Sequence, residues 1–323
     1  MRERTDHRLE RSRAPSVKSW DRRPRADLDL SGTAVVDCGW GRLLFGQTFA
    51  DLRQLAEVLR EERPGKRDVA LYLSDPHVVL SYAPQDLFLD PSHTFRLWIE
   101  RYHAPLRRPK GFHVRLLNSR EDANAIQRLY ASRRMVPPGA DFVWDQRTSR
   151  VLTYWVAEDE QDGTILGVVS AVDHAAAFDD PENGASLWAL AVDAQAPYPG
   201  IGENLVRQVI EFYQARGRVY IDLSVMHDNV KAIKLYERLG FQRIPVFAIK
   251  NKNAYNEPLF LGRTPEADLN PYAAIIVNEA RRRGIGIEVI DAAAGYFALV
   301  LGGRRVVCRE SLSELTTAIA MSR

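Results

Sequence analysis

A Gly-Ile-Gly turn at residues 200–202 carries the first chemical signal in this sequence. It follows an apolar run that ends at Val192, and it opens a segment with helical spacing. The first N–H groups of a helix have no partner within the helix, so they attract anions. We therefore expect a phosphate-binding turn, although Pro197 and Pro199 within it have no N–H to donate.

A second motif, NVKAIKLYERLGF at residues 229–241, lies one predicted strand further along the chain. Its Tyr236 carries a phenol that can act as a general acid, and its Gly240 is typical of a helix C-terminus. Taken alone, such a tyrosine is more often a half-buried aromatic between a helix and a sheet. Two helix N-termini with a strand between them are what a cofactor cleft requires.

The elements that must position these motifs alternate along residues 109–252. Helical spacing of apolar residues predicts helices at 118–133, 200–215 and 229–240. Asp162-Gly163 indicates a hairpin. The apolar runs predict strands at 112–117, 151–159, 164–174, 186–193, 218–225 and 241–250. We expect a mixed sheet flanked by helices, in the α/β (α+β) class.

The region before this segment predicts a smaller α/β unit at residues 29–108. Residues 32–47 resemble two strands joined by a glycine turn, and Thr48 is the expected N-cap of a helix that stops at Pro64-Gly65. Residues 68–74 and 77–82 are expected to be strands or short buried segments. The unit contains no motif that indicates chemistry.

The composition and charge of the chain limit the classes of partner and site that we expect. The net charge of +2 does not favour nucleic acid as a partner, and no apolar run approaches a membrane span. Residues 1–28 are basic and polar, which predicts a disordered leader rather than a signal peptide. Cys38 and Cys308 lack metal-ligand spacing, so we expect no metal site. We expect a cytoplasmic protein without a membrane partner.

The last part of the chain predicts a polar linker at residues 253–270 and then an incomplete segment at 271–323. A helix begins at Pro271, and three strands follow it. Ser311 and Glu314 form a capping-box pattern that predicts a final helix, within which the chain stops. We expect this segment to be the front of something larger.

The two motifs together resemble the GNAT family of acetyl-CoA-dependent N-acetyltransferases, over residues 109–252. The resemblance implies a mostly antiparallel GNAT-like sheet and acetyl-CoA as the cofactor. It implies that the pantetheine arm lies along Leu190, Ala191 and Val192. It places the pyrophosphate at the helix start, at Gly200, Ile201, Gly202, Glu203 and Asn204.

The same resemblance gives roles to the second motif. Asn229 would hydrogen-bond the CoA arm, and Tyr236 would protonate the leaving thiolate. The base that takes the amine proton stays open: His227 is our first choice because imidazole titrates near neutral pH. The alternatives are Asp222, Glu158, or a His227 that only faces solvent.

Arg133 or Arg134 would hold a substrate carboxylate, unless both are solvated surface residues. Residues 271–323 resemble the entry segment of ATP-grasp amino-acid ligases, some of which follow a GNAT half and make an acetylated glutamine dipeptide. This implies glutamine or a glutamine dipeptide as the amine acceptor, and the missing ATP-grasp half or a second copy of the chain as a partner. The alternative for this tail is an unrelated small α/β appendage.

No ligase activity is expected, because the nucleotide-binding parts of an ATP-grasp domain would lie beyond Arg323. The alternative function is a GNAT-shaped scaffold that binds CoA weakly or only docks a ligase half. Pro197 and Pro199 favour this alternative, since each lost hydrogen bond to a charged group weakens binding by about 1.5–3 kcal/mol.

Overall fold

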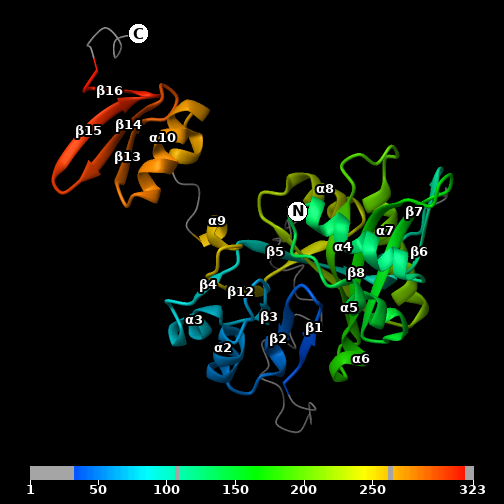
Figure 1. Ribbon diagram of the computed structural model, residues 1–323. Coiled ribbons are helices and arrows are strands. Elements are labelled where there is room, and N and C mark those ends of the chain that lie inside the picture. The colour runs from blue at the N-terminus through cyan, green and yellow to red at the C-terminus, as the bar shows by residue number, and fades with distance from the viewer. Residues whose placement is uncertain (1–32, 106–108, 261–264, 317–323) are drawn as a thin grey trace, which may run out of the picture. The chain divides into compact units, whose positions relative to one another are not determined.

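The computed structural model describes residues 33–105, 109–260 and 265–316 (Figure 1). The basic leader predicted for residues 1–28 lies outside the described residues. The described chain forms two compact units, the first ending at Asn256 and the second starting at Glu257.

A seven-stranded sheet is the centre of the first unit. Its strand order is β11-β5-β10-β9-β8-β7-β6, and only β9 and β10 run parallel to each other. The predicted mixed, mostly antiparallel sheet is therefore confirmed. Its strands are β5 (Ser92–Trp98), β6 (Phe112–Leu116), β7 (Leu152–Asp159), β8 (Ile165–Asp173), β9 (Gly184–Val192), β10 (Tyr220–Met226) and β11 (Gln242–Ile244).

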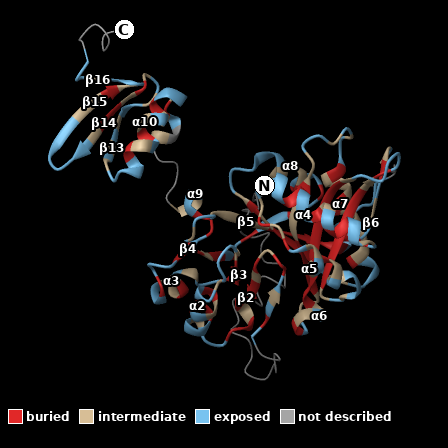
Figure 2. Ribbon diagram, in the orientation of Figure 1, coloured by how far each residue is buried: buried red, intermediate tan, exposed pale blue. Residues whose placement is uncertain are grey.

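Helices cover both faces of this sheet, whose central strands are buried (Figure 2). One face packs against α7 (Ile201–Ala215) and α8 (Val230–Arg238), and the other packs against α4 (Arg120–Ser132). Ser119 and Asp122 start α4 with a capping box, as the polar residues before the apolar stripe predict. The shorter helices are α5 (Ala140–Asp145) and α6 (His174–Phe178).

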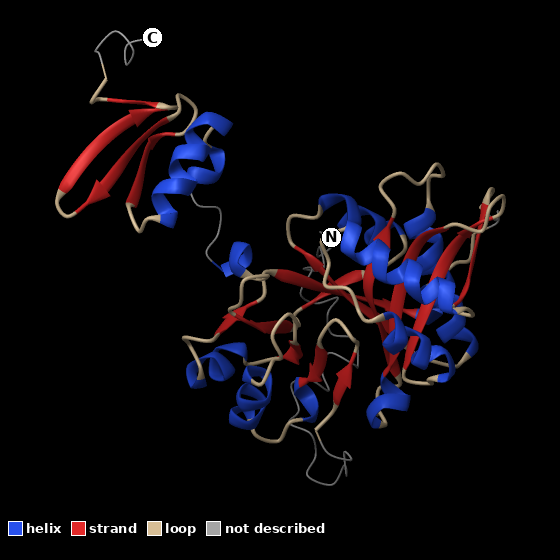
Figure 3. Cartoon of the chain, in the orientation of Figure 1, coloured by secondary structure: helices blue, strands red, loops and turns tan. Residues whose placement is uncertain are grey.

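A five-stranded sheet in the order β1-β2-β3-β12-β4 forms the rest of the first unit. Its apolar face joins α4 and the seven-stranded sheet in one hydrophobic core, which includes Leu43, Phe45 and Leu71 as well as Ile126. Helices α2 (Leu52–Arg60) and α3 (Pro76–Tyr82) lie along it (Figure 3). Its strands are β1 (Val35–Asp37), β2 (Arg42–Phe45), β3 (Val69–Leu73), β4 (Leu87–Leu89) and β12 (Phe247–Asn251).

Two local expectations in this part were wrong. Residues 76–82 form a helix rather than a strand, because Pro76 occupies its first turn and pre-sets the helical φ. The N-cap of α2 is Asp51, whose carboxylate accepts from Arg53 N at 2.8 Å. Thr48 instead ties the end of β2 by donating to Phe45 O and accepting from Ala34 N.

The boundary expected near residue 109 is not a boundary in the structure. Strand β5 comes from the expected N-terminal unit, yet it pairs between β10 and β11 in the larger sheet. Strand β12 comes from the other side and pairs between β3 and β4. The single strand expected at 241–250 is split because Pro245 has no N–H for a ladder, and its halves enter different sheets.

The second unit has its own small core. Helix α10 (Pro271–Arg282) packs Ala273 and Val277 against Phe297 and Cys308. The helix and three strands predicted here are confirmed. The unit also contains α9 (Glu257–Phe260) and an antiparallel sheet of β13 (Gly286–Asp291), β14 (Tyr296–Leu301), β15 (Arg304–Arg309) and β16 (Leu312–Ser313).

The final helix predicted from Ser311 does not start there. Residues Leu312–Ser313 form β16, and Glu314 N donates to Val307 O at 2.8 Å instead of closing a capping box. Residues 317–323 lie outside the described residues. The linker expected at 253–270 contains α9 and a short 3-10 helix at Pro265–Asp268. Further 3-10 helices lie at Gly46–Thr48, Ile99–Arg101 and Gln146–Thr148.

Candidate active site

The two parallel strands of the larger sheet pair only over their first halves. Strands β9 and β10 are in register from Gly184–Tyr220 to Leu187–Leu223. Beyond that pair β9 runs on to Val192 and β10 to Met226 without further pairing between them in the described chain. Their facing main-chain groups are thus available to an extended ligand, which can bind as an added strand.

A bulge in β9 explains why the strands part. Ala189 has a φ of +51°, and the register between β8 and β9 shifts between Val168 and Ser170. A non-glycine residue in this region is uncommon, and a bulge bends its strand. Ser170 Oγ donates to Trp188 O at 3.0 Å and holds the strand at this position.

The N-terminus of α7 follows the end of β9. Gly200 starts the helix with a φ of +84°, which glycine adopts without strain. Within the described part, no hydrogen bond is found for the N–H groups of Ile201, Gly202 and Glu203. A Cβ at Gly202 would lie 3.5 Å from Val192 Cγ2, so the helix start and the strand end are adjacent. Three free N–H groups with the helix dipole suit an anion.

The proline turn uses most of its own donors. Gln195 N donates to the Asp193 carboxylate at 2.8 Å, and Ala196 N donates to Asp193 O at 3.3 Å. Pro197 and Pro199 donate nothing. These residues of the turn therefore offer no free N–H to an anion, and the open donors lie at the helix start.

Glu203 brings a negative charge to the same place. Its carboxylate accepts from Arg207 at 2.9 Å and lies 3.5 Å from Arg238 of α8. Asn204 turns its side-chain amide back to Gly200 O at 2.9 Å. Of the predicted pyrophosphate contacts, the Glu203 and Asn204 side chains are thus engaged within the protein, while the main-chain N–H groups of residues 201–203 are open.

Tyr236 lies on α8, in the core that α7 and α8 share with the sheet, and it is 5% exposed. Burial raises its pKa to about 12, so the phenol stays protonated at neutral pH. Its ring meets Phe241 edge-on with centroids 5.8 Å apart. Its hydroxyl has no hydrogen-bond partner among the described residues, which suits a general acid that donates its proton to a ligand.

Asn229 and His227 lie in the turn between β10 and α8. The Asn229 carbonyl caps α8 by accepting from Ala232 N at 3.2 Å, which leaves its amide NH₂ for a ligand. His227 is exposed, with the His93 ring 6.3 Å away between centroids. This exposure fits the alternative that His227 only faces solvent at least as well as it fits a role as the base.

The remaining predicted polar residues do not converge on the strand ends. Arg133 and Arg134 are exposed at the end of α4. Glu158 is bound by Arg115, and His113 Nε2 lies 3.4 Å away. Of the predicted cofactor residues, Leu190 and Val192 are half-buried, whereas the Ala191 side chain is in the core and offers only its main chain.

Sequence reasoning missed a small pocket of about 10 Å³ where β9 and β10 part. Trp188 and Ser224 are the first residues past the last pair, and both line it. The five-stranded sheet supplies the opposite wall. The full lining is Leu71, Tyr72, Thr94, Trp188, Asp222, Leu223, Ser224 and Ala248.

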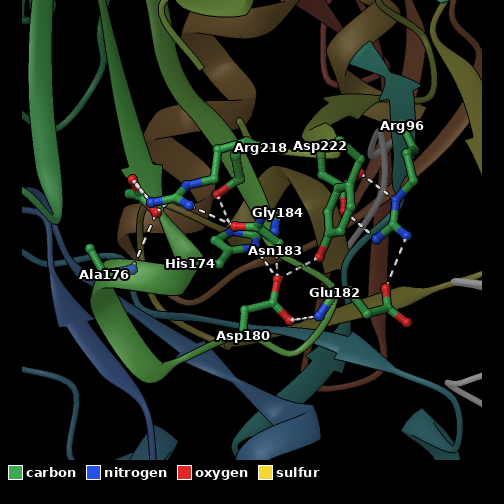
Figure 4. Close-up of polar contacts among 12 residues, drawn as sticks. Arg96, His174, Ala176, Asp180, Glu182, Asn183, Gly184, Arg218 and Asp222 are labelled. Carbon is green, nitrogen blue, oxygen red and sulfur yellow. Dashed lines mark hydrogen bonds and ion pairs between the residues drawn. The ribbon is translucent and has the colours of Figure 1, made fainter. Parts of the chain in front are cut away.

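Asp222 at this pocket belongs to a buried polar cluster (Figure 4). Both of its carboxylate oxygens accept from Arg96 at 2.8 Å, and Arg96 is fully buried. Arg96 also lies over the Tyr220 ring at 3.6 Å and reaches Glu182 at 3.4 Å. Because its carboxylate is held by a guanidinium, Asp222 is a poor candidate for the free base.

A neighbouring set of contacts joins β9, β10 and α6. His174 Nε2 lies 2.8 Å from Ser186 Oγ, and Asp180 accepts from the Tyr220 hydroxyl at 3.1 Å. Ser186 pairs with Asp222 across the strands. Within the described chain, no three His, Cys, Asp or Glu side chains are placed to hold a metal ion. No described helix is long and apolar enough to cross a membrane.

Known proteins resemble this chain over its middle part. It is 33% identical over 93 residues to human N-acetyltransferase 8B, covering 28% of this chain and 38% of the relative. It is 35% identical over 88 residues to mycothiol acetyltransferase of Rhodococcus erythropolis, covering 27% and 29%. The solved GCN5-related N-acetyltransferase of Kribbella flavida is 12% identical to this chain, with a TM-score of 0.44. The match covers 71% of this chain and 93% of that protein.

The aligned regions span well under half of these two curated relatives. Residues 123–241, from α4 to the start of β11, match the acetyltransferase (GNAT) family. That span holds the parted strands, the α7 N-terminus and Tyr236. The middle of the chain is therefore similar to the GNAT acetyltransferases, a family that uses acetyl-CoA as its acetyl donor.

Proposed function

We propose that this protein is an acetyl-CoA-dependent N-acetyltransferase. One observation carries the proposal: β9 and β10 stop pairing halfway along, and β9 ends next to the open N–H groups at the start of α7. A pantetheine arm is extended and amide-bearing, so it can pair with a strand edge. A pyrophosphate is an anion, so it suits a helix N-terminus.

The proposed reaction is direct transfer. A neutral amine attacks the thioester carbonyl, a C–N bond forms, and the C–S bond breaks. Main-chain N–H groups beyond the Ala189 bulge would steady the oxyanion, and the Tyr236 phenol would give its proton to the departing thiolate. We keep His227 as the group that takes the amine proton, because an exposed imidazole can exchange that proton with water.

We further propose glutamine or a glutamine dipeptide as the acceptor, with Arg133 or Arg134 as the partner of its carboxylate. This finer proposal rests on residues 271–323, which resemble the entry segment of N-acetylglutaminylglutamine synthetase. That enzyme joins a GNAT half to an ATP-grasp half and makes the precursor of an osmoprotectant amide. Its ligase half would be the partner of the present chain.

Titration calorimetry with acetyl-CoA and CoA, followed by thiol release with glutamine and Gln-Gln, tests the proposal. We expect binding at micromolar concentration and acceptor-dependent thiol release. Absence of CoA binding at millimolar concentration would contradict it.

A non-catalytic scaffold is the second candidate, and the helix start supports it. Pro197 and Pro199 remove two donors, and the Glu203 carboxylate occupies the first turn of α7. Both features weaken a pyrophosphate site. Binding of CoA without turnover, unchanged in Tyr236→Phe, would favour the scaffold over the enzyme.

A further inference from the structure

The pocket at the parting of β9 and β10 belongs to two sheets. Thr94, Trp188, Asp222, Leu223 and Ser224 come from the seven-stranded sheet, whereas Leu71, Tyr72 and Ala248 come from the five-stranded sheet. If acetyl-CoA lies between the parted strands as proposed, this pocket is at the end of the slot where the two strands converge. The five-stranded sheet then supplies residues next to the proposed reaction site.

The pocket has a defined polarity. Its lining contains the hydroxyl-bearing side chains of Tyr72, Thr94 and Ser224 together with the buried Asp222 carboxylate. None of its described lining side chains is cationic. Arg96 binds both carboxylate oxygens of Asp222, and its remaining nitrogen reaches Glu182 (Figure 4). Asp222 lines the pocket, and Arg96 does not.

The size of the pocket limits what can enter. A volume of about 10 Å³ is at the lower limit for a cavity that holds one water molecule. An amine group is of that size, and an amino-acid backbone is not. Hydroxyls and a carboxylate are the partners that an amine or ammonium prefers, because they accept its N–H bonds.

We propose that this pocket receives the acceptor's amine, and that Asp222 makes it select amines next to a neutral carbonyl over amines next to a free carboxylate. The proposal rests on the proposed acetyltransferase function and narrows its acceptor. In free glutamine the α-carboxylate is two bonds from the nitrogen, so it would stand beside the Asp222 carboxylate. The nearby cation, Arg96, is already engaged by both Asp222 oxygens and by Glu182. In Gln-Gln the same position is a neutral peptide carbonyl.

Acceptor comparison tests the charge argument. Thiol release is measured with glutamine, glutaminamide and Gln-Gln, and kcat/KM is expressed per mole of neutral amine so that differences in amine basicity cancel. We expect glutaminamide and Gln-Gln to exceed glutamine at least tenfold. The preference should shrink at least threefold in Asp222→Asn, which keeps the shape. Equal use of glutamine and glutaminamide by the wild-type protein would overturn the proposal.

A matched pair of substitutions tests the location and does not depend on Asp222→Asn folding. Ala248 is 7% exposed and lines the pocket, whereas Ala83 is 6% exposed in the core under α3 and does not line it. Ala248→Val should raise the KM for Gln-Gln at least fivefold and leave the Kd for CoA within twofold. Ala83→Val should change neither constant.

The outcomes separate the two proposals. If the wild-type protein fails to bind CoA, the acetyltransferase function fails. If it binds CoA and turns over while Ala248→Val leaves the KM for Gln-Gln unchanged, only the pocket assignment fails.

Discussion

The two ends of the candidate site offer different kinds of group to a ligand. The proposed cofactor end, from the β9 bulge to the start of α7, offers main-chain groups: unpaired strand edges and the N–H groups of residues 201–203. The proposed acceptor end offers side chains from two sheets, among them Asp222, which Arg96 binds. The first end depends on the local conformation of the chain, whereas the second depends on the tertiary packing of two sheets.

This difference explains which residues a sequence pattern can find. A glycine turn before a helix fixes where main-chain N–H groups point, whatever the neighbouring side chains are. A pocket made by Tyr72, Asp222 and Ala248 has no spacing to recognise, because these residues meet only when the sheets pack. The comparison predicts that substitutions at the acceptor end disturb the fold most, whereas those at the cofactor end disturb ligand binding.

The largest expected effect is at Arg96. Arg96→Ala leaves Asp222 buried without its cation, and removing one partner of a buried pair destabilises by about 3–5 kcal/mol. Urea unfolding followed by circular dichroism measures it. Arg207→Ala at the cofactor end is the control, because the Arg207 side chain is 19% exposed, and we expect a loss of about 1 kcal/mol or less. Equal losses would remove the distinction between the two ends.

Tyr236→Phe should lower kcat by about 10²-fold or more, since a general acid contributes about 10²–10⁴, and leave the Kd for CoA unchanged. Tyr213→Phe is the control, because Tyr213 is equally buried on α7 outside the proposed chemistry. With the pKa of Tyr236 raised to about 12, kcat should not fall from its ionisation below pH 11. A loss of CoA affinity in place of kcat would make Tyr236 a packing residue.

Glu203→Gln should tighten CoA binding about three- to tenfold at low salt. The substitution removes a negative charge from the first turn of α7 and frees Arg207 and Arg238 to face the pyrophosphate. The gain should shrink as salt is added, because exposed charges are screened. Glu211→Gln, further along α7, should leave the affinity unchanged. An equal Kd in both variants would show that the anion does not sit at the helix start.

The remaining expected effect is the pH dependence of stability that comes from Glu182. Burial raises its pKa from 4.5 to about 7, so the folded protein holds this proton more tightly than the unfolded chain. Its contribution to the free energy of unfolding is therefore fully present below pH 4.5 and is lost as the pH rises through about 7. Glu182→Gln should flatten this part of the stability profile, whereas the exposed Glu160→Gln should not. If Glu182→Gln left the pH dependence of stability unchanged, the Glu182 carboxyl would not be the group that titrates.

Much of the fold followed from local patterns. The helices α4, α7, α8 and α10 and the hairpin at Gly163 came from apolar spacing, caps and turn residues. The errors came where partners are distant. The exchange of β5 and β12 between sheets depends on long-range pairing, which no local pattern specifies. The capping-box pattern at Ser311 lost to pairing of β16 with β15.

For the candidate site, the sequence by itself determined the proposed cofactor end: the glycine turn, the helix that follows and the position of Tyr236. These depend on φ preferences, capping and helical periodicity, which act over a few residues. Only the tertiary structure decided the bulge at Ala189, the place where β9 and β10 part and the buried pairing of Arg96 with Asp222. Those features join residues up to 126 positions apart, and they exist because burying two sheets against each other leaves each polar group there to find a partner.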